Sequence, residues 1–213
     1  TPEALHRLVE SYLSLGLTNE ALAMLQERMP VDPERLGLAA FEISLGAGAY
    51  SDAREQLSQL EQYLGDSETL YVRIADGWEQ LGRPDEAIRL IEEMQASGVT
   101  LSYDDKIKLA SFYEAAGRPQ AAYDLFYEIW LAETNLPRLK FAERQILRLA
   151  FRDEQADAAI VRFENELWGG EPSAKKFELL VLFYARNRDV ASAQATIDKY
   201  VEAYGGDEIS LLN

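Results

Sequence analysis

Apolar residues recur along the chain at intervals of three and four positions, which places them on one face of an α-helix. They come in pairs of segments, and no segment alternates apolar and polar residues as a half-buried strand does. The first segments of the clearest pairs carry Leu5, Leu8, Val9 and Tyr12; Tyr71, Ile74, Ala75 and Trp78; Leu109, Ala110 and Tyr113; and Phe177, Leu180, Val181 and Tyr184. The pattern predicts an all-α protein built from pairs of helices.

A short unit of glycine, four residues and alanine stands between the two segments of a pair. It occurs four times, as Gly16–Ala21, Gly48–Ala53, Gly82–Ala87 and Gly117–Ala122. Two further copies lack the glycine but keep the small residue, at Ala159 and Ala193. The six alanines are 32, 34, 35, 37 and 34 residues apart, which indicates an array of repeats.

Each part of this unit has a structural role. A glycine just past a helix adopts the left-handed conformation that ends the helix. Thr18, Ser51 and Pro84 then suit the start of a second helix, through side-chain capping or a preset φ. The alanine, one turn into that helix, is small enough to let two backbones approach closely. The sequence therefore predicts six helical hairpins, at 2–33, 34–67, 68–102, 103–139, 140–173 and 174–206, with 207–213 as the start of a further helix.

This pattern resembles the tetratricopeptide repeat (TPR), a unit of roughly 34 residues. Its first helix, helix A, carries large residues, a small one and an aromatic, and its second, helix B, carries a small residue. The third and fourth hairpins match best, and the resemblance covers nearly the whole chain. It implies an α-α superhelix, a solenoid whose A helices line a concave groove. We expect a single array over 1–213, an internal fragment of a longer protein.

Two hairpins depart from the pattern. The second contains Leu36–Phe41, rich in glycine and alanine and without a large anchor, and two glycines, Gly46 and Gly48, compete for its turn. The fifth has a longer first helix around Leu136–Phe151 and no turn glycine. We expect altered stacking or register at both places.

Charge and composition disfavour several classes of function. Acidic residues outnumber basic ones 37 to 21, and a net charge of −16 repels phosphate backbones and anionic lipid headgroups. Cysteine is absent and His6 is the only histidine, which leaves little for metal binding or acid–base catalysis. The longest apolar stretch, Leu179–Ala185, is too short to cross a bilayer. We therefore expect no nucleic-acid partner, no membrane insertion, no metal, no cofactor and no enzymatic activity within these residues.

Carboxylates dominate the positions that the TPR resemblance places in the groove. They are Glu3, Glu10, Asp76, Glu79, Asp104 and Glu114, with Arg7, Arg73 and Lys108 among them. Chaperone-tail-binding members of the family hold a peptide carboxylate with lysine, arginine and asparagine there. The asparagines are missing here, so that activity is disfavoured. Either the acidic groove binds a partner, or its acidity only keeps an extended surface soluble.

Two other groupings have structural explanations. Tyr12, Trp78, Tyr113 and Tyr184 resemble a stacking ladder for sugars or bases, but they coincide with the core position of the repeat and are assigned to the hydrophobic core. Adjacent carboxylates such as Asp104 and Asp105 point in different directions on a helix and do not converge on one substrate.

The leading hypothesis for function is a non-catalytic protein-protein interaction scaffold. A narrower form follows from the resemblance, because similar divergent repeats precede outer-membrane export barrels in the exopolysaccharide secretion systems of bacterial biofilms. There the module would lie in the periplasm, recruit a polysaccharide-modifying enzyme and guide the polymer, and an acidic groove suits a cationic polysaccharide. The alternative is an assembly or quality-control adaptor that binds protein clients through the groove, in the periplasm or the cytoplasm.

Overall fold

The computed structural model describes residues 2–65, 67–152, 156–169 and 173–204. Within these ranges the chain is helical and contains no strand, which confirms the all-α prediction. The further helix expected at 207–213 lies outside the described residues.

The chain divides into two compact units, Thr1–Arg118 and Pro119–Asn213. The first contains α1 (Pro2–Ser14), α2 (Thr18–Arg28), α3 (Pro33–Gly46), α4 (Tyr50–Leu60), α5 (Glu68–Gln80), α6 (Pro84–Ala96) and α7 (Tyr103–Ala115), with 3-10 turns at Met29–Val31 and Glu61–Tyr63. The second contains α8 (Pro119–Ala132), α9 (Leu136–Arg152), α10 (Ala156–Gly169), α11 (Ala174–Arg186) and α12 (Val190–Tyr204). The boundary falls inside the fourth predicted hairpin, and the single array over 1–213 stays a prediction.

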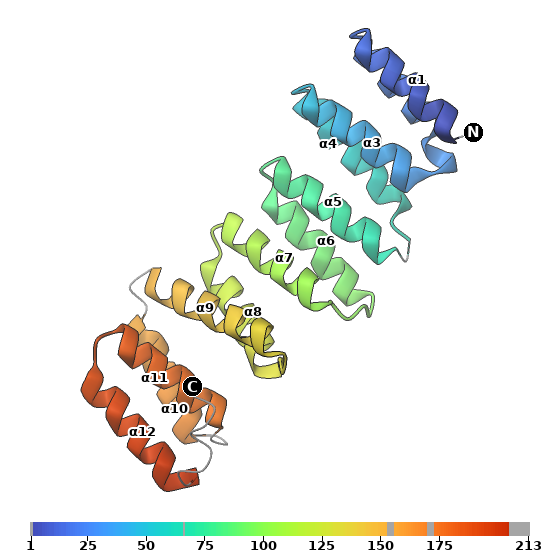
Figure 1. The fold of residues 1–213 in the computed structure, drawn as a ribbon. Coiled ribbons are helices and arrows are strands. Elements are labelled where there is room, and N and C mark those ends of the chain that lie inside the picture. Colours follow the sequence, from blue (N-terminus) through green and yellow to red (C-terminus); the bar gives the residue numbers. More distant parts are fainter. Residues whose placement is uncertain (1, 66, 153–155, 170–172, 205–213) are drawn as a thin grey trace. The chain divides into compact units, whose positions relative to one another are not determined.

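In the first unit, consecutive helices pack as hairpins, and each helix A also packs on the helix B before it. Figure 1 shows α3, α5 and α7 side by side, so the A helices of this unit share one face. A core cluster joins Leu5 and Val9 of α1 to Leu22 and Leu25 of α2 and to Leu36 of α3. Leu5 and Val9 of the predicted apolar pattern therefore hold the first hairpins together, whereas Leu8 of the same pattern is exposed.

The second unit has an aromatic core, and the two helices of its hairpin α9–α10 are only loosely packed on each other. The ring centroid of Phe163 lies 5.3 Å from that of Tyr127 and 5.0 Å from that of Phe183, which ties α8, α10 and α11 together. Helix α9 packs closely on α8, whereas its contacts with α10 are sparse. Helix α9 has 17 residues, so the longer first helix and the altered stacking predicted for the fifth hairpin are both found.

The turn glycines adopt the conformation expected from the sequence. Gly16, Gly48, Gly82 and Gly117 have φ of 74°, 72°, 68° and 70°, which confirms the left-handed turn and selects Gly48 over Gly46. Arg188 takes the same conformation in the last hairpin, with φ of 61°. The turn geometry is thus kept even where the glycine is lost.

Side-chain capping by Thr18 and Ser51 is wrong. The N-caps of α2 and α4 are Leu17 and Ala49, and neither helix has a side-chain cap. The cap is in each case the residue directly after the left-handed glycine, so the helix begins too early for Thr18 or Ser51 to cap it. Pro84 does stand in the first turn of α6, as predicted. Side-chain caps start A helices at Asp32, Ser67, Ser102 and Ser173, and Asp189 caps the B helix α12 by accepting a hydrogen bond from the backbone N–H of Ser192.

The hairpin alanines are buried as the repeat requires. Ala21, Ala53, Ala87 and Ala122 are fully buried and Ala193 nearly so. Ala159 is only half-buried, because α10 stands away from α9.

The second hairpin does have large anchors, contrary to the sequence interpretation. Leu36, Leu38 and Phe41 are all buried. Gly37 contributes by having no side chain, since a Cβ there would lie 2.3 Å from Cδ2 of Leu60 on α4. The small residues of this stretch therefore allow α3 and α4 to pack closely.

Candidate interaction surface

The A helices of the first unit carry a ladder of ion pairs. Lys108 of α7 pairs with Asp76 of α5. Arg73 of α5 lies 3.7 Å from Glu34 and 3.9 Å from Glu42 of α3, between guanidinium nitrogen and carboxylate oxygen. In the pairs Lys108–Asp76 and Arg73–Glu42, a base 14 residues before one hairpin alanine meets an acid 11 residues before the previous alanine, whereas Glu34 lies outside this register. We call the surface that carries these five residues the A-helix face.

In α3 the base position of the ladder is not occupied by a basic residue. Ala39 stands in α3 where Arg73 and Lys108 stand in α5 and α7. Glu10, which occupies the acid position in α1, instead lies 3.2 Å from Nε2 of His6 on its own helix, and both side chains are exposed.

The six predicted acidic residues therefore differ in their surroundings. Asp76 is paired with Lys108, whereas Glu10, Glu79 and Asp104 are exposed, and Glu114 is half-buried. Glu3 lies in α1, but its side chain is outside the described part of the chain. Glu79 lies one turn from Asp76, so it faces the same side of α5. Sequence reasoning missed Glu34 and Glu42, which share Arg73.

Within the described residues, three of the four aromatic residues at the core position, all except Tyr12 of α1, donate hydrogen bonds to carboxylates of the preceding hairpin. Nε1 of Trp78 lies 2.7 Å from Oε1 of Glu61, and the hydroxyl of Tyr113 lies 2.8 Å from Oε1 of Glu92. The hydroxyl of Tyr184 donates to Glu164. All three donors stand nine residues before a hairpin alanine.

Their burial agrees with a structural role. Trp78 and Tyr184 are buried, and Tyr113 is half-buried. Burial, with the hydrogen bond to Glu164 second, raises the pKa of Tyr184 above its usual value. These contacts support the core assignment of Trp78 and Tyr184, and they engage Glu61, Glu92 and Glu164, to which sequence reasoning gives no role.

Two hairpins have a small residue in place of this aromatic. In α3 it is Ser44, which is fully buried. Its Oγ has no hydrogen-bond partner among the described residues. In α9 it is Ala150, which lines a pocket. Both are hairpins whose sequence departs from the repeat pattern.

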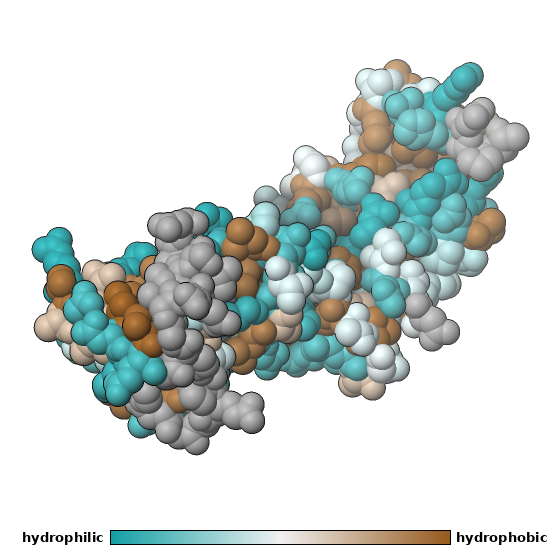
Figure 2. Space-filling view, turned by 60° about the horizontal axis from the view of Figure 1, so that its bottom comes forward, coloured by the Kyte–Doolittle hydropathy of each residue, from teal (hydrophilic) through white to brown (hydrophobic). Residues whose placement is uncertain are grey.

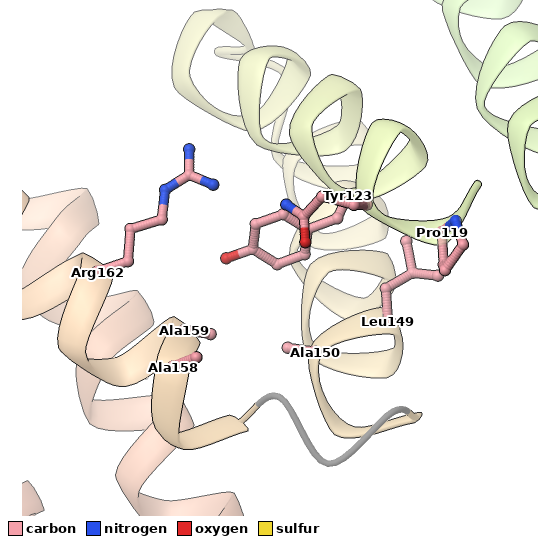
Figure 3. A pocket seen from close by; sticks show the side chains of 8 residues that line it. Pro119, Tyr123, Leu149, Ala150, Ala158, Ala159 and Arg162 are labelled. Atoms are coloured by element: carbon pink, nitrogen blue, oxygen red, sulfur yellow. The ribbon is translucent and has the colours of Figure 1, made fainter.

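The pocket beside Ala150 has a volume of about 140 Å³ and lies between α8, α9 and α10. Its lining comprises Pro119, Gln120, Tyr123, Leu149, Ala150, Ala158, Ala159 and Arg162. Figure 3 shows the methyl groups of Ala150 and Ala159 facing one another across it, with Tyr123 behind.

Arg162 borders the pocket, and its guanidinium group is held by Asp124 and two tyrosine rings. Its Nη1 donates a 2.9 Å hydrogen bond to Oδ1 of Asp124. Its guanidinium carbon lies 5.7 Å from the ring centroid of Tyr123 and 5.5 Å from that of Tyr127, within the range of a cation–π contact.

A second charged cluster ties α9 to α11. Nζ of Lys140 lies 3.0 Å from Oε2 of Glu143 and 2.6 Å from Oε1 of Glu178. Glu143 is 7% exposed, and burial raises its pKa even though Lys140 opposes that shift. Lys140 is shared by two carboxylates on different helices, so the cluster contributes to the packing of α11 on α9.

Neither a cluster of metal-ligating side chains nor a membrane span is found in the described residues. In that part of the chain, no group of three or more histidine, aspartate or glutamate side chains is placed to hold a metal ion. Its helices include none with the length and apolarity needed to cross a membrane. Figure 2 shows hydrophobic residues scattered among hydrophilic ones on the face in view.

A family model for the PPR repeat matches residues 70–99, most of α5 together with α6. A search of curated proteins gives no significant match.

Among solved structures, nearly identical TPR-like repeats from Podosopora anserina share 16% identity, with 87% of this chain and 95% of that chain covered and a TM-score of 0.51. The structure of Naa15/Naa10 bound to HypK-THB shares 11% identity and has a TM-score of 0.53, with 96% of this chain covered and only 32% of that one. These likenesses identify the fold as a TPR-like helical repeat.

Proposed function

We propose that the chain is a non-catalytic scaffold that binds a partner protein through the A-helix face. The observation that carries the proposal is the ladder of Glu34 and Glu42 with Arg73, and of Asp76 with Lys108. It leaves carboxylates in excess on one exposed surface, and a basic segment of a partner complements such a surface.

The geometry of the Arg73 contacts would allow a basic side chain of a partner to take the place of Arg73 beside Glu42. Distances of 3.7 and 3.9 Å are longer than a direct hydrogen bond, and the side chain of Glu42 is 69% exposed. Exposed pairs of this kind contribute about 0–1 kcal/mol. A lysine or arginine from a partner can therefore replace Arg73 beside Glu42 at little cost to the fold.

Two narrower functions remain within this proposal. In the first, the module works in the periplasm in exopolysaccharide export, where it recruits a polysaccharide-modifying enzyme and contacts a cationic polymer. In the second, it is an assembly or quality-control adaptor for protein clients. The complex of Naa15/Naa10 with HypK-THB supports the general idea that an array of similar fold takes part in protein assemblies.

Binding to three probes separates these functions. We expect a lysine-rich peptide to bind with an affinity that falls as salt rises, since exposed charges are screened within about 8 Å at physiological ionic strength. Salt-sensitive retention of partly deacetylated poly-glucosamine favours export, and its absence favours the adaptor. Single-stranded RNA tests the PPR match, because PPR repeats elsewhere read RNA bases. We expect no RNA binding at a net charge of −16.

A pair of charge-reversal variants tests the surface itself. Glu42→Lys with Glu79→Lys reverses two exposed carboxylates of the A helices, and we expect it to abolish peptide binding while helicity is kept. Glu20→Lys with Glu27→Lys makes the same change in charge on exposed positions of α2. If both double variants lose binding equally, net charge alone is responsible and the A-helix face is not the site.

A further inference from the structure

The repeats of the chain themselves indicate what the pocket beside Ala150 accommodates. At the same repeat position, nine residues before the hairpin alanine, α5, α7 and α11 place Trp78, Tyr113 and Tyr184. Each of these side chains donates a hydrogen bond to a carboxylate of the preceding hairpin, at Glu61 in the 3-10 turn after α4, at Glu92 in α6 and at Glu164 in α10. In α9 the side chain is a single methyl group, and a pocket of about 140 Å³ opens beside it.

The size and lining of the pocket suit an aromatic ring. An apolar cavity of about 150 Å³ accepts one benzene molecule. Methyl groups of Ala150 and Ala159 face each other across the space, and the ring of Tyr123 forms a wall (Figure 3). Aromatic rings pack favourably against such a wall in edge-to-face or offset geometry.

The polar groups at the pocket favour a ring that carries a hydrogen-bonding group. Gln120 and the hydroxyl-bearing side chain of Tyr123 line it, and the guanidinium of Arg162 borders it. Arg162 is held by Asp124 and by the faces of Tyr123 and Tyr127, so its position is fixed before any ligand arrives. A phenol offers a ring for the apolar walls and a hydroxyl for these groups.

We propose that this pocket binds a tyrosine side chain presented by a partner protein, beside the repeat position that carries an aromatic residue in three other hairpins. The proposal rests on the scaffold function and names one anchor of the partner. A buried aromatic anchor is the kind of contact that dominates the affinity of protein interfaces.

The test uses p-cresol and N-acetyl-tyrosinamide as probes, followed by NMR of the whole chain with labelled alanine methyl groups. Both probes should shift the methyl signals of Ala150, Ala158 and Ala159 in a saturable way, and N-acetyl-leucinamide should not. Absence of saturable shifts with both probes would overturn the proposal. Shifts with p-cresol alone would also overturn it, because the pocket would then exclude a tyrosine that carries peptide groups.

Filling the pocket provides the matched control. Ala150→Phe should raise the melting temperature and abolish the shifts at Ala159, whereas Ala23→Phe, on the exposed side of α2, should leave them unchanged. If Ala150→Phe does not fold, Ala159→Leu fills the same space from α10. Unchanged probe shifts in a folded pocket-filling variant would contradict the assignment.

Failure of this inference is distinguishable from failure of the scaffold proposal. The double variant Glu42→Lys with Glu79→Lys should keep the methyl shifts caused by N-acetyl-tyrosinamide while it loses binding of the lysine-rich peptide. Loss of these shifts in the double variant would contradict the inference that the pocket binds its ligand independently of the A-helix face.

Discussion

Nε1 of Trp78 donates a 2.7 Å hydrogen bond to Oε1 of Glu61, which joins α5 to the 3-10 turn at the end of the second hairpin. The other oxygen, Oε2, lies 2.7 Å from Nη2 of Arg89 on α6. Trp78 is only 6% exposed, so Glu61 is the acceptor that satisfies its buried N–H. One carboxylate thus connects two consecutive hairpins.

Glu61→Ala should lower the free energy of unfolding by about 1–3 kcal/mol, because it leaves a buried donor unsatisfied. Glu61→Gln should cost less, since its amide oxygen still accepts from the indole and only the ion pair with Arg89 is lost. Urea unfolding followed by tryptophan fluorescence measures both. Glu55→Ala is the control, because its exposed carboxylate accepts a hydrogen bond from Gln59 on the same helix and does not connect two hairpins in the described residues. Equal losses at positions 55 and 61 would contradict the role of the Trp78 contact.

Gly37 offers a test of the close packing between α3 and α4. Its substitution by alanine places a Cβ 2.3 Å from Cδ2 of Leu60, which is fully buried and cannot move aside freely. Gly37→Ala should therefore destabilise the first unit by about 1–3 kcal/mol. Gly46→Ala, in the same helix but with no atom within 4 Å of the new Cβ, should be neutral or stabilise by up to about 1 kcal/mol. Thermal unfolding of the two variants should shift in opposite directions or by clearly different amounts.

Arg188 holds a backbone conformation that the other hairpins give to glycine. Its φ of 61° costs a residue with a Cβ about 1–2 kcal/mol, while glycine adopts it freely. Glycine loses more entropy on folding, which offsets part of this gain, so we expect Arg188→Gly to raise the free energy of unfolding by no more than about 1 kcal/mol. Arg188→Ala removes the same side chain without relieving the strain, so its stability should stay near that of the wild type. An increase in the free energy of unfolding in both Arg188→Gly and Arg188→Ala would show that removal of the arginine charge causes the effect.

The fold could be predicted from the sequence because its signals are local. The left-handed turn at Gly82 and the burial of Ala87 both lie within one short unit and act through backbone geometry. The core position of Trp78 follows from the helical period. The capping box of Ser102 and Asp105 is readable in the same way, as serine followed three residues later by an acid, although sequence reasoning considers Asp105 only as the neighbour of Asp104.

The charge arrangement could not be predicted to the same extent, because its partners are distant in sequence. Asp76 and Lys108 are 32 residues apart, and Glu61 and Trp78 are 17 apart, so their contacts depend on how consecutive hairpins pack. The pocket did leave a signal, since Ala150 replaces an aromatic at a defined repeat position. Its size, however, depends on how far α10 stands from α9, which no local pattern specifies.

The buried hydroxyl of Tyr184 makes stability depend on pH in the alkaline range. Tyrosine in an unfolded chain has a pKa of about 10, and burial together with Glu164 raises the pKa of Tyr184 in the folded state. A raised pKa means that the contribution of this group is complete below pH 10 and is lost as pH rises from about 10 through the folded-state value. The wild type should therefore lose up to about 1.4 kcal/mol per pH unit above pH 10 through this residue.

Tyr184→Phe removes this linkage. Below pH 9 the variant should be less stable than the wild type by about 1 kcal/mol, because the hydrogen bond to Glu164 is missing. Above pH 10 the difference should shrink, since only the wild type then loses the Tyr184 contribution. Urea unfolding between pH 8 and 11 measures the difference, with Tyr63→Phe as a control that leaves the contact between Tyr184 and Glu164 intact. A difference that stays constant across this range would show that burial does not hold the Tyr184 proton.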